Sequence, residues 1–434
     1  MAEVLARHVP PGARVALGYS GGLDSSVLLH VLAGLQTSRA FTLSAVHVHH
    51  GLSPLADGWA AWCAESCAAL GVPLVTARVQ LRPRDPAGTE AAARQARHRI
   101  FAGLDVDCLV TAHHRDDQAE TFLLQALRGA GPKGLAAMPA YLHPRGWKAA
   151  QLRPLLAFPR ARLQQAARAW GLHWVEDESN LSTRYRRNAL RLSVMPRLRE
   201  CFPGCDATLA RVASHQAETA ALLDDLAQID AAGGCSQTPA GLRLDCDALA
   251  TLTPARARNL LRYFIAQHGV TLPNARRLDE ARQQLVAARH DARVRVELGE
   301  AALWGWRKGA YVVAAGRLPA PAIWRGESEL DLPGLGRLGF RAALGQGLRQ
   351  ASLAAGRVEL GCRRGGEQLR LRPGGPTHSL KVLLQANDVP PWTRARLAIL
   401  RCDGVTVWAE GLGCHADWLA GPAEAGWVPD WRPA

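Results

Sequence analysis

Short apolar runs alternate with helical patterns from residue 14 to about residue 130, and no other feature of the sequence constrains the fold as much. Runs rich in Val and Leu predict four buried strands, at Arg14–Tyr19, Leu43–Val48, Pro73–Val79 and Cys108–Thr111. The helical patterns between and after them predict helices at Ser25–Leu35, Asp57–Leu70, Gly88–Leu104 and Asp116–Leu127. This alternation predicts an α/β domain with a doubly wound parallel sheet. Ligands of such sheets lie beyond the carboxyl ends of the strands, so the loops at 19–24, 49–55 and 112–116 are the places to search.

The rest of the chain divides into two further parts. Helical patterns at 206–230, 254–267 and 274–288 and short strands at 294–298 and 310–314 predict a mostly helical middle domain. A Pro- and Gly-rich stretch at 315–335 is typical of a linker, and a small α+β module with a helix near Leu380–Gln385 follows it. We therefore expect three domains, at residues 1–200, 201–320 and 321–434.

Charge favours a polyanionic partner, because the 434 residues carry a formal net charge of +14. Only four of the 52 basic residues are lysine, and the arginine excess has two interpretations, phosphate recognition or a coding bias. The ten cysteines are scattered without a CxxC pair, which argues against a disulfide framework or a cysteine-ligated metal. The sequence shows neither a leader peptide nor a membrane-spanning run, so we expect a cytoplasmic protein with no membrane partner.

The segment after the first predicted strand, Ser20-Gly21-Gly22-Leu23-Asp24-Ser25, has the composition of a phosphate-binding loop. The two glycines permit φ > 0 and close approach of backbone N–H groups to an anion. A helix that starts near Ser25 adds its free N–H groups. Asp24 would repel phosphate by itself, so we expect it to hold Mg²⁺ beside the phosphates. The alternative is an ordinary Gly-Gly turn with Asp24 or Ser25 as the helix cap.

Three polar segments are expected at the same edge of the sheet, and one of them is Glu90–Arg97, with its two arginines Arg94 and Arg97. Val46–Ser53 carries His49 and His50, and Thr111–Thr121 carries two histidines and several carboxylates. His113, Asp117 and Glu120 are spaced i, i+4 and i+7, so a helix that begins there would place them on one face. Such a cluster can bind Mg²⁺, position a proton acceptor or attract an amine. The alternatives are that Asp116 or Asp117 caps the helix and that His49 and His50 are turn residues.

Short motifs lie in order along the chain: Ser20–Ser25, Val46–Ser53, Glu90–Arg97, Thr111–Thr121, Gly129–Leu135, Leu152–Leu156, Trp174–Asn180 with Arg187 and Asn188, Arg363–Glu367 and Leu380–Trp392. They are dense up to about residue 200, faint in the middle and clear again near the end. The SGGxDS pattern resembles the PP-loop family of ATP pyrophosphatases, and the ordered set of motifs is similar to the tRNA(Ile)-lysidine synthetases.

This resemblance implies an ATP-dependent ligase that forms a C–N bond. The O2 atom of the wobble cytidine in the CAU anticodon of tRNA(Ile) would attack the α-phosphate of ATP, and pyrophosphate would leave. The ε-amine of free L-lysine would then attack C2 and release AMP, which changes codon reading from AUG to AUA. Because the pKa of a free lysine amine is about 10.4, a base or a desolvating pocket is needed to make the amine neutral. The resemblance is also compatible with a protein that forms a homodimer.

The resemblance also assigns roles by position. Ser20, Gly21, Gly22, Leu23, Asp24 and Ser25 would bind ATP, and Asp24 would bind Mg²⁺ and pyrophosphate. His113 and Asp117 would serve the adenylation site, and Arg94 would stabilise phosphate charge. The candidates for the lysine pocket are Asp116, Glu120, Glu176 and Asp177.

The chain departs from the family pattern at Val382, where many relatives carry a second lysine, which puts a tRNA contact there in doubt. Four arginines, at positions 184, 186, 187 and 191, would either contact tRNA phosphates or form a solvated helix face. Two rival functions fit part of the pattern. One is a tRNA cytidine thiolase, although such relatives commonly use the CxxC cysteines that this sequence lacks. The other is a non-catalytic tRNA-binding protein, against which the intact Ser20, Asp24, His113 and Asp117 argue.

Overall fold

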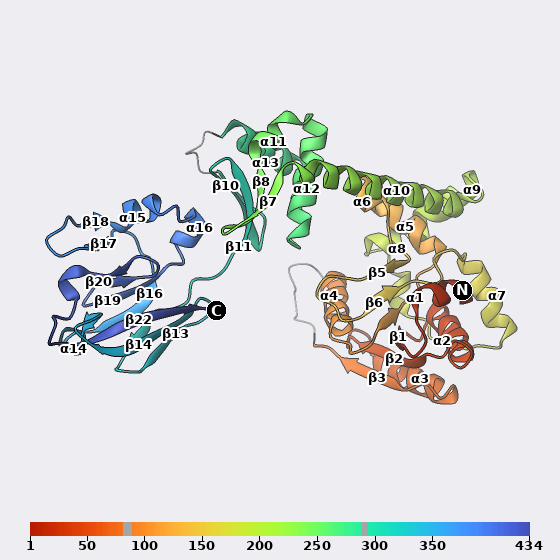
Figure 1. Cartoon of the computed structure of the whole chain (residues 1–434). Coiled ribbons are helices and arrows are strands. Elements are labelled where there is room, and N and C mark those ends of the chain that lie inside the picture. Colours follow the sequence, from red (N-terminus) through yellow and green to blue (C-terminus); the bar gives the residue numbers. More distant parts are fainter. Residues whose placement is uncertain (81–88, 289–293) are drawn as a thin grey trace. The chain divides into compact units, whose positions relative to one another are not determined.

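The computed structural model describes residues 1–80, 89–288 and 294–434, without the side chains at 89, 90, 179 and 180. Glu90, the first residue of one expected motif, is therefore outside the described side chains. The chain divides into two compact units, Met1–Asp225 and Leu226–Ala434. Each unit is an arrangement of helices against sheets (Figure 1).

The first unit contains the predicted parallel sheet, with strand order β3-β2-β1-β4-β6-β5. All pairs are parallel except that of β5 with β6 at one edge. The strands are β1 (Arg14–Gly18), β2 (Thr42–His49), β3 (Leu74–Arg78), β4 (Cys108–Val110), β5 (Tyr141–Leu142) and β6 (Ala150–Leu152). Because β1 lies between β2 and β4, the strand order reverses at β1, and the carboxyl ends of β1 and β4 form the switch point where ligands bind.

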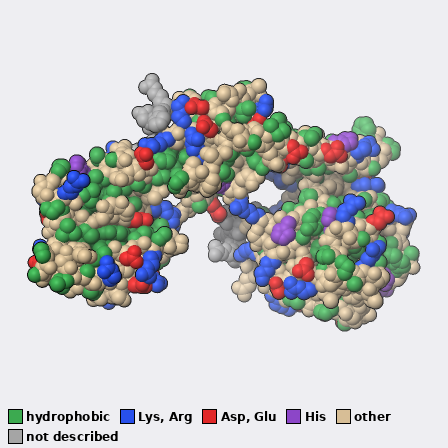
Figure 2. Space-filling model, viewed as in Figure 1, with side chains coloured by type: hydrophobic (Ala, Val, Ile, Leu, Met, Phe, Trp, Pro, Cys, Tyr) green, Lys and Arg blue, Asp and Glu red, His purple; other side chains and the backbone are tan. Residues whose placement is uncertain are grey.

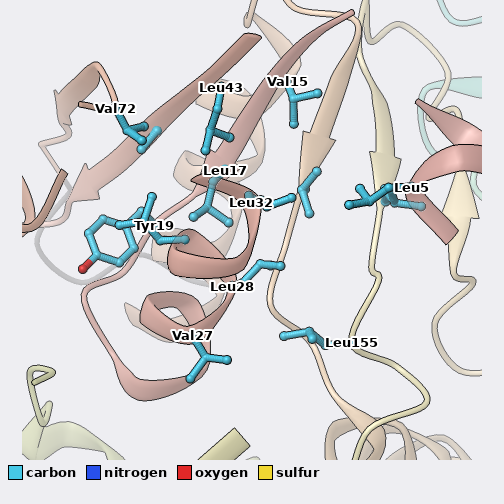
Figure 3. Close-up of a cluster of buried hydrophobic side chains, with 14 of the residues drawn as sticks. Leu5, Val15, Leu17, Tyr19, Val27, Leu28, Leu32, Leu43, Val72 and Leu155 are labelled. Carbon is cyan, nitrogen blue, oxygen red and sulfur yellow. The ribbon is translucent and has the colours of Figure 1, made fainter. Parts of the chain in front are cut away.

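Helices cover both faces of this sheet. The larger core joins the sheet to α1 (Ala2–His8), α2 (Leu23–Leu35), α3 (Ala56–Ala69) and α7 (Arg160–Ala169). Figure 3 shows part of it, with Leu17 and Tyr19 of the β1 segment near Leu28 and Leu32 of α2. A second core joins the sheet to α4 (Thr89–Ala102). The bounds of the strands and helices predicted here are confirmed to within two residues wherever the structure describes them. The prediction that all four strands are buried is wrong for β3, which lies at the edge of the sheet and is mostly exposed.

The carboxyl-terminal part of the first unit is helical. A third apolar cluster packs α5 (Arg115–Ala126) against residues 190–209. The remaining helices are α6 (Pro132–Leu135), a turn of 3-10 helix (Glu178–Leu181), α8 (Arg186–Ala189), a π-helical turn (Leu190–Val194), α9 (Met195–Cys201) and α10 (Cys205–Ala232). The boundary between the two units falls within α10.

The second unit begins with helices packed on a sheet of order β7-β8-β11-β10-β9. The expected helices are present as α12 (Pro254–Gln267) and α13 (Ala275–Ala287), beside the short α11 (Cys246–Thr251). The strands are β7 (Cys235–Thr238), β8 (Gly241–Asp245), β9 (Val294–Glu297), β10 (Ala301–Trp306) and β11 (Gly309–Ala314). Only β9 and β11 were predicted. β7 and β8 carry several polar residues, whereas β10 is an apolar run that sequence reasoning missed.

The end of the chain is the predicted α+β module, in which a five-stranded and a four-stranded sheet share one core. Its strands are β12 (Ala322–Trp324), β13 (Glu329–Leu332), β14 (Gly336–Leu344), β15 (Leu348–Arg349), β16 (Val358–Cys362), β17 (Gln368–Leu369), β18 (His378–Ser379), β19 (Ala398–Cys402), β20 (Val405–Ala409), β21 (Gly413–Cys414) and β22 (Ala425–Pro433). Its helices are α14 (Gln350–Ala354), α15 (Leu380–Ala386) and α16 (Pro391–Arg394). The stretch predicted to be a linker, 315–335, contains β12 and β13 and is therefore partly ordered into sheet.

Candidate active site

The loop between β1 and α2 presents unpaired backbone N–H groups at the switch point of the sheet. Helix α2 begins at Leu23, two residues earlier than predicted, and its N-cap residue is Gly22. No side chain caps this helix, so neither Asp24 nor Ser25 has the capping role that was the alternative. The first N–H groups of an α-helix have no partner within the helix, and together with the helix dipole they attract an anion. The loop therefore retains the donors that a phosphate needs.

Gly21 is held in a conformation that requires glycine. Its φ is +80°, in the left-handed region. A Cβ at this position would lie 2.9 Å from Sγ of Cys63 on α3 and 3.6 Å from the side chain of Val175. The backbone N–H of Val175 donates to the carbonyl oxygen of Gly21 at 2.9 Å. The loop is thus clamped between α3 and the segment around residue 175.

Two hydroxyl groups line the same loop. Oγ of Ser20 and Oγ of Ser25 lie 3.0 Å apart, and Ser25 donates to the carbonyl oxygen of Gly22 at 2.9 Å. Both residues were predicted to contact phosphate, and the structure places their hydroxyls together at the start of α2. Rotation of either hydroxyl would redirect its hydrogen atom toward a bound anion.

Asp24 has an incompletely satisfied carboxylate. Its Oδ1 atom is buried and has no hydrogen-bond partner among the described residues, although Nε of Arg160 lies 3.8 Å away. Its Oδ2 atom lies 3.6 Å from Nε2 of His114. No group of three or more potential metal-ligating side chains occurs in the described parts of the chain. One unsatisfied carboxylate oxygen beside a phosphate site fits Mg²⁺, which takes one or two carboxylates together with phosphate oxygens.

His114 links Asp24 to α5, a role that sequence reasoning missed. Its Nδ1 accepts a hydrogen bond from the backbone N–H of Asp117, and the Asp117 carboxylate accepts one from the backbone N–H of His114. This reciprocal pair is a capping box in which histidine takes the position usual for Ser or Thr. Burial alone would lower the pKa of His114, but the hydrogen bond with Asp24 and the charges of Asp117 and Asp24 outweigh it and raise the pKa.

His113 lies just before this cap, so the prediction that it shares a helix face with Asp117 and Glu120 is wrong. Helix α5 starts at Arg115, and His113 precedes its N-cap residue. Nδ1 of His113 lies 3.0 Å from Oγ1 of Thr111. Burial lowers the pKa of His113 to about 3, despite the opposing effect of the Asp117 charge. His113 is therefore neutral at physiological pH and is a weak proton acceptor.

Asp117 and Glu120 lie together on α5 and hold two arginines from a distant part of the chain. Nε of Arg187 donates to Glu120 at 3.1 Å, and its Nη2 donates to Asp117 at 2.8 Å. Nε of Arg191 donates to Glu120 at 2.7 Å, and its Nη2 donates to Asp117 at 3.0 Å. The side chain of Glu120 is only 2% exposed. The sequence predicts phosphate contacts or a solvated helix face for these two arginines, and the structure places both on buried carboxylates.

The other candidates for a lysine pocket lie in different surroundings. Asp116 accepts a hydrogen bond from the backbone N–H of Arg160 at 3.1 Å and pairs with Arg199 at 3.3 Å. Glu176 is exposed and accepts from Nε1 of Trp174 at 3.4 Å. Asp177 is half-buried in the same segment. The structure therefore brings Asp116, Asp117 and Glu120 to the start of α5 and leaves the carboxylates at 176 and 177 beside the loop segment that contacts Gly21.

A pocket of about 510 Å³ is lined by Trp62, His173, Trp174 and Val175. It adjoins the phosphate loop, because Trp62 and Val175 both lie within 4 Å of a Cβ placed on Gly21. Aromatic walls of this kind suit an unstacked nucleobase.

Arg94 and His49, two residues singled out in the sequence, differ in exposure. Arg94, on α4, is exposed, and its charge lowers the pKa of Arg153, although less than burial does. His49 is buried with its Nε2 3.3 Å from the carboxylate of Asp57. Arg94 is thus available to a ligand, whereas His49 contacts a carboxylate of the protein itself.

Comparison with known proteins matches three successive parts of the chain to family models. Models described as a PP-loop domain, a TilS substrate binding domain and a TilS substrate C-terminal domain match residues 2–198, 244–311 and 358–431. The tRNA(Ile)-lysidine synthase of Nitrosomonas europaea is 40% identical over 99% of this chain and 94% of its own length. That of Azoarcus sp. strain BH72 is 43% identical over 100% of this chain and 95% of its own length. The chain belongs to the tRNA(Ile)-lysidine synthase family. The predicted family and the predicted PP-loop domain are thereby confirmed.

The carboxyl-terminal motif of this family has a structural explanation in the chain. The carboxylate of Glu367 accepts hydrogen bonds from the backbone N–H groups of Arg364 and Gly365 and pairs with the buried Arg401 at 3.0 Å. Gly365 and Gly366 have φ of +100° and +82°, which only glycine adopts readily. The motif Arg363–Glu367 therefore builds a tight turn anchored on a buried ion pair.

Val382, the departure from the lysidine synthase pattern, lies on α15 and is 52% exposed. A lysine at this position would thus project from a surface helix. No helix in the described parts of the chain is long and apolar enough to cross a bilayer.

Proposed function

We propose that this chain ligates free L-lysine onto C2 of the wobble cytidine in the CAU anticodon of tRNA(Ile), with conversion of ATP to AMP and pyrophosphate. The observation that carries this proposal is the similarity to tRNA(Ile)-lysidine synthases over essentially the full chain. The unpaired N–H groups at the start of α2 and the unsatisfied Asp24 carboxylate support it. Cytoplasm is the compartment that we propose for this reaction.

In the first step, O2 of the cytidine attacks the α-phosphorus of ATP, and the bond from this phosphorus to the bridging oxygen breaks. The N–H groups of the loop, together with the hydroxyls of Ser20 and Ser25, hold the departing pyrophosphate. Mg²⁺ bound at Asp24 would supply neutralising charge on the phosphate oxygens. Arg94 stabilises charge on the reacting phosphate, since it is exposed on α4 and free to turn toward a ligand.

In the second step, the lysine amine attacks C2, the bond from C2 to the AMP oxygen breaks, and the amine loses a proton. We propose that Glu120 belongs to the lysine pocket as a group that orients Arg187 and Arg191, because its buried carboxylate is already paired with both arginines. Asp116, Glu176 and Asp177 are the other members of the proposed pocket. His113, neutral at physiological pH, would act as a hydrogen-bonding group in the adenylation site beside Asp117 and not as the main base.

The reacting cytidine must leave the stack of the anticodon loop to be reached. The pocket formed by Trp62 and Trp174 beside Gly21 offers it a stacking surface next to the phosphate loop. We also propose three functional parts, a catalytic domain at 1–200, a tRNA-binding domain at 201–320 and a tRNA-recognition domain at 321–434. The three separately matched family models support this division.

A single-turnover reaction with labelled lysine, ATP and a tRNA(Ile) transcript tests the proposal. The expected result is incorporation of label into the tRNA with release of one AMP and one pyrophosphate. Label in a tRNA(Met) transcript, which shares the CAU anticodon, would contradict the proposed substrate. Transfer of sulfur to the cytidine would establish the thiolase alternative, and binding of tRNA without consumption of ATP would establish a non-catalytic role.

A further inference from the structure

Arg160 lies beside the phosphate loop, and the proposed reaction gives its side chain no role. It is the first residue of α7, which packs beside α2 in the larger core of the first unit (Figure 1). The two helices begin close together, because Nε of Arg160 lies 3.8 Å from Oδ1 of Asp24, the second residue of α2. The guanidinium group of Arg160 is therefore next to the site proposed for the departing pyrophosphate.

The backbone of Arg160 is held by contacts with the start of α5. Its N–H group donates to Oδ1 of Asp116 at 3.1 Å. Two residues earlier, the carbonyl oxygen of Phe158 accepts a hydrogen bond from the N–H group of Arg115 at 2.9 Å. Further along α7, Leu163 is buried in the core that includes α2. Because the backbone is fixed on both sides of this position, a change at Arg160 acts through its side chain.

The guanidinium group itself is not committed to the protein. The Arg160 side chain is 43% exposed, and over residues 1–80, 89–288 and 294–434 its guanidinium group makes no hydrogen bond. Its one ion pair over those residues is the contact with Asp24. At 3.8 Å this contact is longer than a hydrogen bond, so the two groups attract each other by charge alone. The N–H donors of Arg160 are thus available to a ligand.

The carboxylate of Asp24 is also incompletely paired. Its Oδ1 atom is buried and has no hydrogen-bond partner in the described parts of the chain, and its Oδ2 atom lies 3.6 Å from Nε2 of His114. Mg²⁺ binds carboxylate and phosphate oxygens directly. If the ion takes Oδ1, Asp24 no longer depends on the charge of Arg160. The guanidinium group is then free to bind phosphate oxygens beside the same carboxylate.

A guanidinium group fits this position chemically, because its planar N–H donors bind phosphate oxygens in pairs. In the proposed first step, the bond from the α-phosphorus to the bridging oxygen breaks, and this oxygen keeps the electron pair. The negative charge of the pyrophosphate therefore increases as it leaves. A cation beside it stabilises the transition state more than the bound substrate, which raises the rate of the step.

We propose that Arg160 binds the pyrophosphate part of ATP and stabilises the negative charge that this group gains as it leaves. The inference rests on the proposed function, because that reaction releases pyrophosphate. In the ligand-free protein, the same guanidinium group partly compensates the charge of Asp24.

A phosphate of the tRNA backbone is the other source of the same chemistry. The position of Arg160 favours ATP, because Asp24 belongs to the first turn of α2, and the free N–H groups of that turn form the anion site of the loop. A phosphate held by these N–H groups lies next to Asp24 and hence next to Arg160. Binding measurements with each ligand distinguish the two sources.

The test uses the full-length protein with Arg160→Met, Arg160→Lys and, as the matched control, Arg162→Met. Arg162 is exposed two positions further along α7, so its replacement removes the same charge from the same helix, about 200° around the helix axis. Calorimetry measures the binding of pyrophosphate, ATP and AMP, each with Mg²⁺. A gel shift measures binding of the tRNA(Ile) transcript, and thermal unfolding of each variant is recorded without ligand.

Arg160→Met should weaken the binding of pyrophosphate and of ATP about tenfold, because a hydrogen bond to a charged group is lost at a partly exposed position. AMP affinity should stay the same in the wild type and all variants, since AMP lacks the pyrophosphate part. Arg160→Lys should bind pyrophosphate with intermediate affinity, because lysine keeps the charge but not the paired donors. The melting temperature of Arg160→Met should match that of Arg162→Met, because exposed ion pairs contribute little to stability.

Three results would overturn the inference. The first is equal pyrophosphate affinity of Arg160→Met and Arg162→Met. The second is a loss of tRNA affinity with unchanged pyrophosphate binding, which would assign Arg160 to the RNA backbone. The third is an equal loss of AMP and pyrophosphate affinity, which would indicate a distorted loop. These measurements do not depend on turnover, so a wild-type protein that binds ATP but incorporates no lysine would contradict the proposed function and leave this inference to its own data.

Discussion

Glu120 offers a quantitative test of the network that closes the start of α5. Its carboxylate is 2% exposed and accepts three hydrogen bonds from Arg187 and Arg191. Glu120→Gln keeps the shape but removes the charge and turns one acceptor into a donor that faces donors. Removal of one member of a buried ion pair costs about 3–5 kcal/mol. We expect the lower end, about 3 kcal/mol, because both arginines retain Asp117 as a partner and are partly exposed.

Calorimetric unfolding of the full-length protein measures this effect. For a unit of this size, 1 kcal/mol corresponds to a shift of about 2–4 °C, so the transition of Met1–Asp225 should fall by about 6–12 °C. Glu65→Gln, at an exposed position of α3, is the control and should change stability by less than about 0.5 kcal/mol. Combining Glu120→Gln with Arg191→Met should restore part of the loss through a coupling energy of about 0.5–3 kcal/mol. A shift no larger than that of the control, or no coupling with Arg191, would refute the reasoning.

Four further changes have expected outcomes. Gly21→Ala should abolish ATP binding, because the added Cβ would lie 2.9 Å from Sγ of Cys63. Gly12→Ala is the control: Gly12 has a similar φ of +82° and open space around it, so this variant should lose only about 1–2 kcal/mol of stability. Calorimetric unfolding and ATP titration compare the two variants. Asp24→Ala should eliminate lysine incorporation while a gel shift shows intact tRNA binding, and normal turnover would remove the metal-site assignment. Val382→Lys should tighten tRNA binding and steepen its salt dependence by about one ion, as a filter-binding titration would show. Burial alone would raise the pKa of Glu367, but backbone N–H groups and Arg401 hold it below its ordinary value. The ionised Glu367 carboxylate therefore stabilises the fold above a pH of about 4.3, and this contribution is lost as the pH falls below that value. Glu367→Gln should make the free energy of unfolding less dependent on pH in the acidic range.

The central strands of the first unit were predictable from sequence because β1 and β4 are buried on both faces. Continuous apolar runs such as Val15–Leu17 and Cys108–Val110 identify such strands without knowledge of their neighbours. The middle sheet was missed in part, because β7 (Cys235–Thr238) is mostly polar and is ordered by pairing with β8. A strand of this kind becomes recognisable only when its partner is known, since its stability comes from cross-strand contacts.

Only part of the candidate site was predictable from the sequence. The loop Ser20–Ser25 can be recognised from its own residues, because its two glycines and two hydroxyl groups are suited to binding a phosphate. His114 escaped notice because histidine is not a favoured helix cap, although the carboxylate of Asp117 three residues later was a signal of a capping box. The pairing of Arg187 with Asp117 joins residues 70 positions apart, and no local pattern specifies such a contact.

Charge gives the clearest case of what structure adds to composition. A net charge of +14 predicts a polyanionic partner without saying which arginines meet it. Basic and acidic side chains are interspersed over the visible face of each unit (Figure 2). Arg187 and Arg191 lie in an arginine-rich stretch, yet their charges are used inside the protein by two carboxylates. Arg153 lies outside that stretch, in the motif Leu152–Leu156, and donates to two neutral acceptors, the carbonyl oxygen of Pro139 and Oε1 of Gln151. The position of an arginine in a basic stretch therefore does not by itself identify a nucleic-acid contact, because a buried carboxylate of the protein can already compensate its charge.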